Sequence, residues 1–125
     1  MMIKIDIPSP DVVITKKKQL GEKVESVISS EYGFTDYHRI PRDKGGIILF
    51  FDANEDLLFV GKARKLRPRV KRHFEDSVSP LKLHRDEIDK IAVCVVEDPM
   101  EREIYETFII NKLHAKYNID KVFFK

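Results

Sequence analysis

The sequence is poor in the features that mark secreted and membrane proteins. Its 125 residues contain a single cysteine, Cys94, so no disulfide can form within the chain. Because Cys94 lies in the apolar run IAVCVV, we interpret it as a core residue rather than a nucleophile. No apolar run approaches the roughly 20 residues of a membrane span, and the N-terminus lacks a signal peptide's apolar segment. We therefore expect a cytoplasmic protein.

The net charge is also small, at +2, and does not by itself identify a nucleic-acid binder. The distribution of charge is more informative, because acidic residues collect at 75–76, 86–89 and 97–106. A local basic stripe on a balanced chain is typical of a protein that contacts a polyanion over a limited surface. Seven basic residues without an acid form such a stripe: Lys62, Arg64, Lys65, Arg67, Arg69, Lys71 and Arg72.

The first 39 residues carry no chemical motif and are predicted to form an N-terminal extension. Residues 2–7 alternate between apolar and charged types, which predicts a short half-exposed strand. Apolar residues at helical spacing predict an amphipathic helix over about residues 16–32: Leu20, Val24, Val27 and Ile28.

A sheet is predicted from three apolar segments in residues 40–125. The run 47–51 suits a strand buried on both faces, and 57–60 pairs back with it after the polar turn 52–56. The run 91–96 forms the third buried strand. The predicted fold class is therefore α/β (α+β), with a small three-stranded, largely antiparallel sheet flanked by helices.

Two of the flanking helices have recognisable starts. Ser79 and Pro80 predict a short charged helix over 80–89, with serine as N-cap and proline in the first turn. Asp98 and Pro99 predict a longer helix in the same way. Residues 117–125 stay unassigned. The apolar face of the longer helix is predicted to comprise Ile104, Tyr105, Phe108, Ile109 and Leu113.

The basic segment is predicted to form a third helix. Gly61 lets the backbone turn tightly after the second strand into a helix that runs through about Glu75. Because Pro68 falls inside this segment, either the first turn is irregular or the regular helix begins near Arg67, with proline at N1. Guanidinium groups suit phosphate oxygens and can offset charge that develops in phosphoryl transfer. Composition alone leaves a phosphate-binding surface and a solvated helix face equally open. The helix is expected to dock through Leu66, Val70 and Phe74.

Two sequence blocks resemble a known family. The first, PRDKGGIILFFDANEDLLFVGKARKLRPRVKRHF, resembles the core motif of the GIY-YIG nuclease superfamily. The nearest likeness is to the N-terminal nuclease domain of the C component of the bacterial ABC excinuclease. The second block, EREIYETFIINKLHAKYNI, resembles that domain's later acidic helix and its Lys-Tyr-Asn ending. The likeness covers roughly residues 40–119 and implies a GIY-YIG-like domain at 40–125.

The resemblance implies roles for individual residues. Arg69, ten positions after Phe59, stands at the place of the family's catalytic arginine, and Lys62 at that of the lysine after the glycine. Glu106 stands where the family holds one divalent ion, Mg²⁺ or Mn²⁺, and Asn118 where an asparagine supports the site. DNA binding is then expected from all seven basic residues between Lys62 and Arg72.

Both signature tyrosines of the family are replaced. Gly46-Ile47-Ile48 stands for Gly-Ile-Tyr, and Phe59-Val60-Gly61 for Tyr-Ile-Gly, so the degenerate motif positions are Gly46, Ile48, Phe59 and Gly61. Phenylalanine cannot relay a proton, and general-base catalysis is worth roughly 10²–10⁴-fold. Activation of water by a metal ion at Glu106 offers a partial replacement.

By side-chain chemistry alone, five other residues are candidates to replace the lost hydroxyl: Tyr37, His38, His73, Tyr105 and Tyr117. We interpret His73 and Tyr105 as packing residues. The histidines show no paired spacing of the kind that zinc sites use, so no zinc is expected.

The sequence leaves two functions open. The first is a DNA-binding, metal-dependent endonuclease domain of the GIY-YIG type, acting in DNA repair as excinucleases do in nucleotide excision repair. The second is a catalytically inactive module of the same origin that binds DNA or a repair protein. Neither function involves a membrane.

Overall fold

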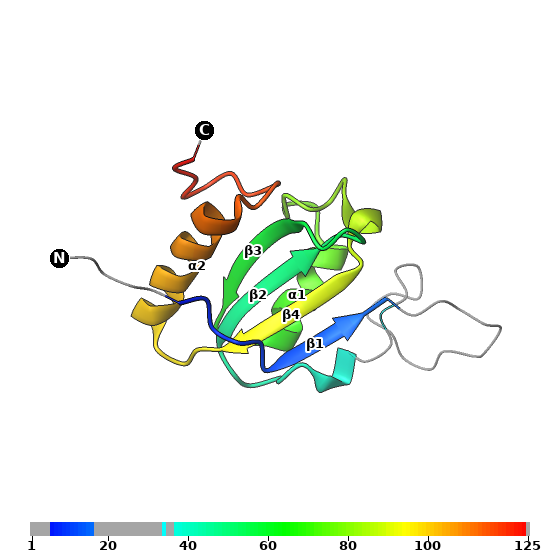
Figure 1. The fold of residues 1–125 in the computed structure, drawn as a ribbon. Helices are drawn as coiled ribbons and strands as arrows, with labels where there is room; N and C mark the ends of the chain where they lie inside the picture. The colour runs from blue at the N-terminus through cyan, green and yellow to red at the C-terminus, as the bar shows by residue number, and fades with distance from the viewer. Residues whose placement is uncertain (1–5, 17–33, 35–36, 125) are drawn as a thin grey trace.

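A four-stranded sheet forms the centre of the structure (Figure 1). The computed structural model describes residues 6–16, 34 and 37–124. Every neighbouring pair of strands is antiparallel, and the order across the sheet is β1-β4-β2-β3. The predicted α+β architecture is confirmed, with four strands instead of three. The strands are β1 (Val12–Thr15), β2 (Gly46–Phe51), β3 (Leu57–Ala63) and β4 (Lys90–Val95).

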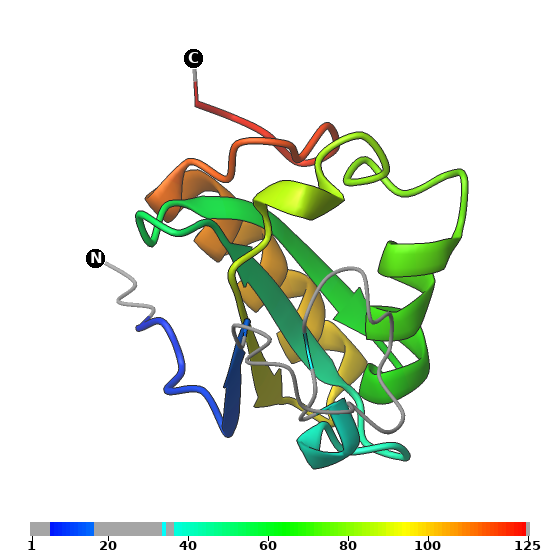
Figure 2. The same cartoon turned by 90° about the vertical axis from the view of Figure 1, so that its right-hand side faces the viewer.

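One helix covers each face of this sheet (Figure 2). α1 (Leu66–Glu75) shares a core with Ile48 and Phe50 of β2, and α2 (Pro99–Leu113) shares the opposite core with Ile47 and Leu49. Successive side chains of a strand point to opposite faces, so β2 supplies both cores. The unbroken apolar sequence of β2 thus reflects burial on both sides, as predicted.

The start of α1 differs from the prediction. β3 continues through Gly61 and Lys62 in register with β2, so the expected tight turn at Gly61 is absent. α1 begins at Leu66, with Lys65 as N-cap. Pro68 is therefore the third helical residue, where a missing N–H costs no hydrogen bond inside the helix. The predicted docking stripe is confirmed, because Leu66, Val70 and Phe74 are all buried.

Gly46 is required where β2 and β4 approach each other. A Cβ on Gly46 would lie only 2.0 Å from the carbonyl oxygen of Cys94. Cys94 is itself buried, and burial raises the pKa of its thiol to about 11, in agreement with its predicted core role. The glycine that begins the degenerate motif thus has a packing reason of its own.

The predicted helix over 80–89 is wrong. The segment consists of turns and one short 3₁₀ helix, η2 (Arg85–Glu87). Its backbone hydrogen bonds join residues three apart, as in His84 N–H to Leu81 O and Glu87 N–H to His84 O. A helix this short gains little from its own hydrogen bonds, and burial of Leu81 and Ile88 holds the segment in place.

The predicted apolar face of α2 is wrong in part. The start is confirmed, because the Asp98 side chain accepts hydrogen bonds from the N–H groups of Met100 and Glu101. Ile104 and Leu113 are 45% and 42% exposed, however. The residues that α2 buries include two charged ones: Arg102, Glu106, Ile109 and Ile110.

The N-terminal predictions are mostly outside the described residues. Of the predicted strand 2–7, residues 6 and 7 are described and are not in a strand. The strand that forms is β1, a β-branched segment after Pro10 that pairs with β4 and widens the sheet. The predicted helix 16–32 lies outside the described residues apart from residue 16. The division at residue 39 stays a prediction.

The chain after α2 runs back along the outer edge of β3. The N–H groups of Lys116 and Tyr117 donate to the carbonyls of Leu57 and Leu58. Tyr117 is anchored in turn by Glu87, to which its hydroxyl donates at 2.8 Å. This unassigned segment therefore continues the edge of the sheet. Within the described residues, no helix combines the length and apolarity needed to cross a membrane.

Candidate functional site

A cleft of about 520 Å³ lies beside β3, between α1 and the chain that follows α2. Phe59 and Lys62 reach it from β3, Arg69 from α1 and Glu106 from α2. Asn118 lines it from the returning tail. Residues that lie up to 59 positions apart in the sequence are thus gathered in one place. These are the residues for which the sequence predicted phosphate binding, metal binding and support of the site.

Ile48 does not share this cleft. Its side chain is fully buried in the core with α1, and its backbone pairs with Gly61 and Val93. Phe59 does line the cleft, but its ring packs against His73 and Phe50, with centroids 5.2 and 6.3 Å away. Both positions therefore keep a structural role, and neither offers a hydroxyl to the site.

A basic surface extends from the cleft along α1. A second hollow, of about 630 Å³, shares Lys62, Arg69 and Arg72 with the first and adds Arg64 and Lys65. Among the described residues, no side chain forms an ion pair or hydrogen bond with any of the exposed groups Arg64, Lys65, Arg69, Lys71 and Arg72. Their donors are free to meet phosphate oxygens.

Arg67 differs from its neighbours on α1. Its guanidinium donates to the carbonyls of Ile40 at 2.8 Å and His38 at 2.6 Å. The ring of Tyr37 lies 5.9 Å from it, and the Tyr37 hydroxyl donates back to the Arg67 carbonyl. Arg67 thus ties the segment 37–40 to the helix, and its Nε and Nη2 groups are engaged by backbone carbonyls.

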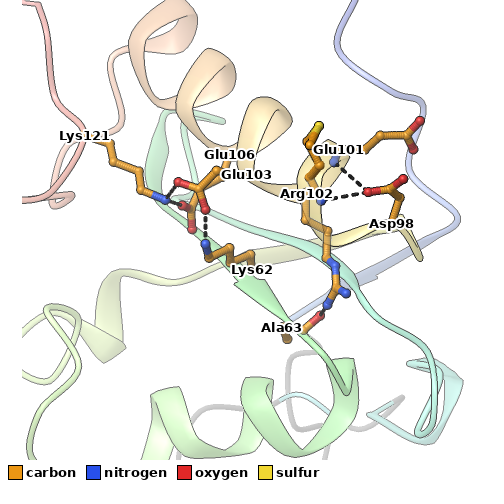
Figure 3. A network of polar contacts seen from close by, with 9 residues as sticks. Lys62, Ala63, Asp98, Glu101, Arg102, Glu103, Glu106 and Lys121 are labelled. Carbon is orange, nitrogen blue, oxygen red and sulfur yellow. Dashed lines mark hydrogen bonds and ion pairs between the residues drawn. The ribbon is translucent and has the colours of Figure 1, made fainter.

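Two glutamates and two lysines form a network beside the cleft, which Lys62, Glu106 and Lys121 line (Figure 3). Lys121 Nζ lies 2.6 Å from Glu106 Oε1 and also pairs with Glu103. Lys62 pairs with the other oxygen of Glu103. Hydrogen bonds from Lys121 and Lys62 lower the pKa of Glu103 to about 2. The two negative and two positive charges balance each other within this network.

The carboxylate of Glu106 fits a divalent cation in its chemistry. Hard oxygen donors suit Mg²⁺, which commonly keeps several waters and takes one or two carboxylates from the protein. The side chain is 11% exposed, and one of its oxygens is already bonded to Lys121. No group of three or more metal-binding side chains occurs in the described part of the chain. Glu106 would therefore hold a metal mainly through water-completed coordination.

Arg102 fixes α2 against the end of β3, one turn before Glu106 (Figure 3). It is buried, and its guanidinium donates to the carbonyl of Ala63 at 2.7 Å and to that of Glu97 at 3.3 Å. Its Nε is the one buried side-chain nitrogen or oxygen without a partner among the described residues. The bond to Ala63 sets the helix, and hence Glu106, at a defined distance from β3.

Asn118 clamps the tail onto β3. Its side-chain oxygen accepts from the Val60 N–H at 2.9 Å, and its side-chain nitrogen donates to the Val60 carbonyl at 3.0 Å. One side chain thus satisfies both outward-facing groups of an edge-strand residue. Asn118 shapes the wall of the cleft next to Phe59, which fits the supporting role expected for it.

His73 lines the same cleft from α1. Burial, together with the nearby Arg69 guanidinium, lowers its pKa to about 4, so the imidazole is neutral at pH 7. Nδ1 lies 2.8 Å from the hydroxyl of buried Ser79, which also accepts from the Leu81 N–H. If Ser79 donates its proton to this nitrogen, the His73 proton lies on Nε2. His73 then faces Gly61 and the cleft as a donor rather than a base.

Sequence reasoning missed Lys121 and the network around it. A single lysine 15 residues after Glu106, in a stretch without periodicity, carries no signal of its own. It also missed the burial of Arg102, because charged residues are expected on the exposed face of a helix. An i, i+4 spacing of Arg102 and Glu106 on one face was the available clue.

Known proteins share this sequence pattern. Residues 44–119 match the family model of the UvrC-like GIY-YIG domain. The uncharacterized protein YurQ of Bacillus subtilis is 66% identical over 124 residues, which cover 99% of this chain and all of YurQ. The UvrABC system protein C of Nautilia profundicola is 36% identical over 86 residues, 62% of this chain but only 14% of that protein.

A solved structure shares the fold. It is the GIY-YIG N-terminal endonuclease domain of UvrC from Thermotoga maritima, bound to its catalytic divalent cation, magnesium. The match has a TM-score of 0.57 and 24% identity, and covers 63% of this chain and 88% of that chain. At this identity the likeness shows the fold alone. Together with the family match, it confirms the resemblance drawn from the two sequence blocks.

The neutral state of His73 predicts that folding stability falls in acid. Its pKa is about 4 in the folded chain and 6.5 in an unfolded one, so between these pH values only the unfolded chain binds the proton. The contribution of neutral His73 to the free energy of unfolding is complete above pH 6.5 and is lost as the pH falls towards 4. From pH 7 to 5 the loss is about 2 kcal/mol, measurable by urea denaturation.

The matched variants are His73→Gln and His38→Gln. His73→Gln should reduce this pH dependence, because glutamine does not titrate, whereas His38→Gln changes an exposed residue and should keep it. A His73→Gln protein with the full wild-type pH dependence would show that another group is responsible.

Proposed function

This chain belongs to the UvrC-like GIY-YIG domain family, and from that premise we propose that it binds DNA along α1 and hydrolyses a phosphodiester in the cleft beside β3. The observation that carries the proposal is the gathering of Arg69, Lys62 and Glu106 around one cleft. Folding alone does not require an arginine and a lysine to face a glutamate across a solvent-filled hollow. Phosphoryl transfer does require such a placement, because charge must be offset at the phosphate.

Binding would begin with the free cations of the basic surface. Arg64, Lys65 and Arg72 line the hollow that joins the cleft, and they form a track for a phosphate backbone. Contacts of this kind carry no sequence information. We therefore propose affinity for the DNA backbone, steeply dependent on salt.

In the cleft, Arg69 and Lys62 would bind the non-bridging oxygens of one phosphate. Lys62 is already oriented by Glu103, and Arg69 is free to approach. Water would attack phosphorus in line with the leaving oxygen, whose bond to phosphorus breaks. One proton of the water ends on the leaving oxygen, and the other stays with the phosphomonoester product. A divalent ion at Glu106, Mg²⁺ or Mn²⁺, would lower the pKa of water and offset charge on the phosphate. His73 Nε2–H would donate to a phosphate oxygen from α1.

A second function is favoured by Ile48 and Phe59. Neither position supplies a hydroxyl, and Ile48 is buried outside the cleft. Loss of a general base costs roughly 10²–10⁴-fold in rate, so a binding module without hydrolysis is the competing proposal. Relatives named UvrABC system protein C suggest DNA repair in the cytoplasm as the setting, with a repair protein as partner. This chain spans about 14% of such a protein.

Loss of Arg69 is expected to weaken DNA binding through lost charge. The Arg69→Gln protein should bind a duplex oligonucleotide more weakly, and the slope of log K against log salt should fall by about one unit for each phosphate that is no longer neutralised. Fluorescence anisotropy at several salt concentrations measures both quantities. Arg67→Gln is the matched control, because Arg67 is held by Ile40 and His38. It should lose folding stability but keep the salt slope. Equal salt slopes for Arg69→Gln and the wild type would contradict the proposed surface.

Cleavage is expected to be slow and metal-dependent. Wild-type protein should nick supercoiled plasmid with Mg²⁺ or Mn²⁺ and not with chelator. Glu106→Gln should abolish nicking while leaving the exposed basic track intact, and Arg69→Gln should lower it at least about 100-fold, as loss of a charge-offsetting group does. Phe59→Tyr restores the missing hydroxyl and should increase the rate. If the wild type and all of these variants bind DNA in a salt-sensitive way and none of them nicks the plasmid, the chain is a binding module rather than a nuclease.

A further inference from the structure

The tail after Asn118 places Lys121 next to two glutamates of α2, Glu103 and Glu106. Asn111 on α2 donates its side-chain amide to the carbonyls of Lys121 and Thr107, both at 2.8 Å. Its oxygen accepts from the N–H of Phe123. The ring of Phe124 stacks on His114, with centroids 4.3 Å apart. The turn that carries Lys121 is thus anchored on both sides.

The backbone of Lys121 is itself unusual. Its φ of 63° lies in the left-handed region, which residues other than glycine seldom adopt. Such a conformation costs free energy and persists only where surrounding contacts impose it. The Asn111 bonds and the ion pairs of Lys121 supply those contacts.

The ammonium group ends where a cation at Glu106 would lie. Lys121 Nζ is 2.6 Å from Glu106 Oε1 and pairs with Glu103 as well (Figure 3). The Glu106 side chain is 11% exposed, so its negative charge depends on a nearby positive partner. Lys121 is that partner in this structure. A divalent ion bound to this carboxylate would lie close to the ammonium, so the two positive charges would repel each other.

We propose that Lys121 is a built-in competitor for the divalent cation, and that metal binding at Glu106 displaces its ammonium group. The inference rests on the proposed function for the location of the metal at Glu106. Lys121 would hold the charge of Glu106 in balance while the cleft is metal-free. Release of its side chain would also make Lys121, which lines the cleft, a further cation for phosphate.

Lys121→Met tests the competition directly, because methionine keeps most of the side chain and removes the charge. Binding of Mn²⁺ to the full chain, without DNA, is measured by electron paramagnetic resonance. We expect the Mn²⁺ dissociation constant to fall about tenfold or more, since the metal no longer has to break a charge-assisted hydrogen bond. Lys112→Met, on the same helix as Glu106 but outside the network, should match the wild type. Glu106→Gln added to Lys121→Met should remove the gain.

A wild-type measurement covers the case in which Lys121→Met is poorly folded. Mg²⁺ is titrated into the isotopically labelled chain, and the side-chain Nζ resonances of Lys121 and Lys112 are followed by NMR. The proposal predicts a shift at Lys121 and none at Lys112. It is overturned if Mg²⁺ binds without affecting Lys121, or if folded Lys121→Met binds Mn²⁺ no more tightly than the wild type. Neither measurement uses DNA, so failure of DNA binding or nicking is a separate result.

Discussion

The outer edge of β3 is the constraint on which the rest of the site depends. An edge strand exposes backbone donors and acceptors that must be paired or protected. Here the tail pairs with them, through the N–H groups of Lys116 and Tyr117 and both polar atoms of the Asn118 side chain. This pairing closes the sheet and fixes the wall of the cleft. It also determines that the chain beyond Asn118 turns back over α2.

The same edge explains why charged residues are buried at this point of the fold. α2 must pack across the sheet close to β3, so its inward face meets strand carbonyls as well as apolar side chains. Arg102 satisfies the carbonyl of Ala63, and Glu106 meets an ammonium from the tail. The buried carboxylate is tolerated because a positive partner lies next to it. The structure thus places the negative charge of Glu106 in the cleft that the exposed basic residues of α1 also line.

Local sequence patterns correctly predicted those elements that are determined by residues close together in the sequence. The run of β2, the stripe Leu66-Val70-Phe74 and the Asp98 cap all formed as expected, because burial and capping act over a few residues. The family resemblance predicted that Arg69, Lys62 and Glu106 act at one site. Their spacing in the sequence alone could not predict this. The roles of Arg67 and Lys121 were not predictable, because each depends on a partner 15 or more residues away. β3 extended through Gly61 because pairing with β2 outweighed the flexibility of glycine.

The central claim is that DNA binds at the cleft beside β3 and along α1. Chemical-shift mapping of the ¹⁵N-labelled chain during titration with a short duplex tests it most directly. If DNA binds at this site, the largest chemical-shift changes should occur at the amides of Phe59 to Lys62, Arg69 to His73 and Asn118. These changes should all become smaller together as the salt concentration is raised. Shifts concentrated instead on β1 or around Ile104 and Phe108 of α2, with the cleft unchanged, would contradict it.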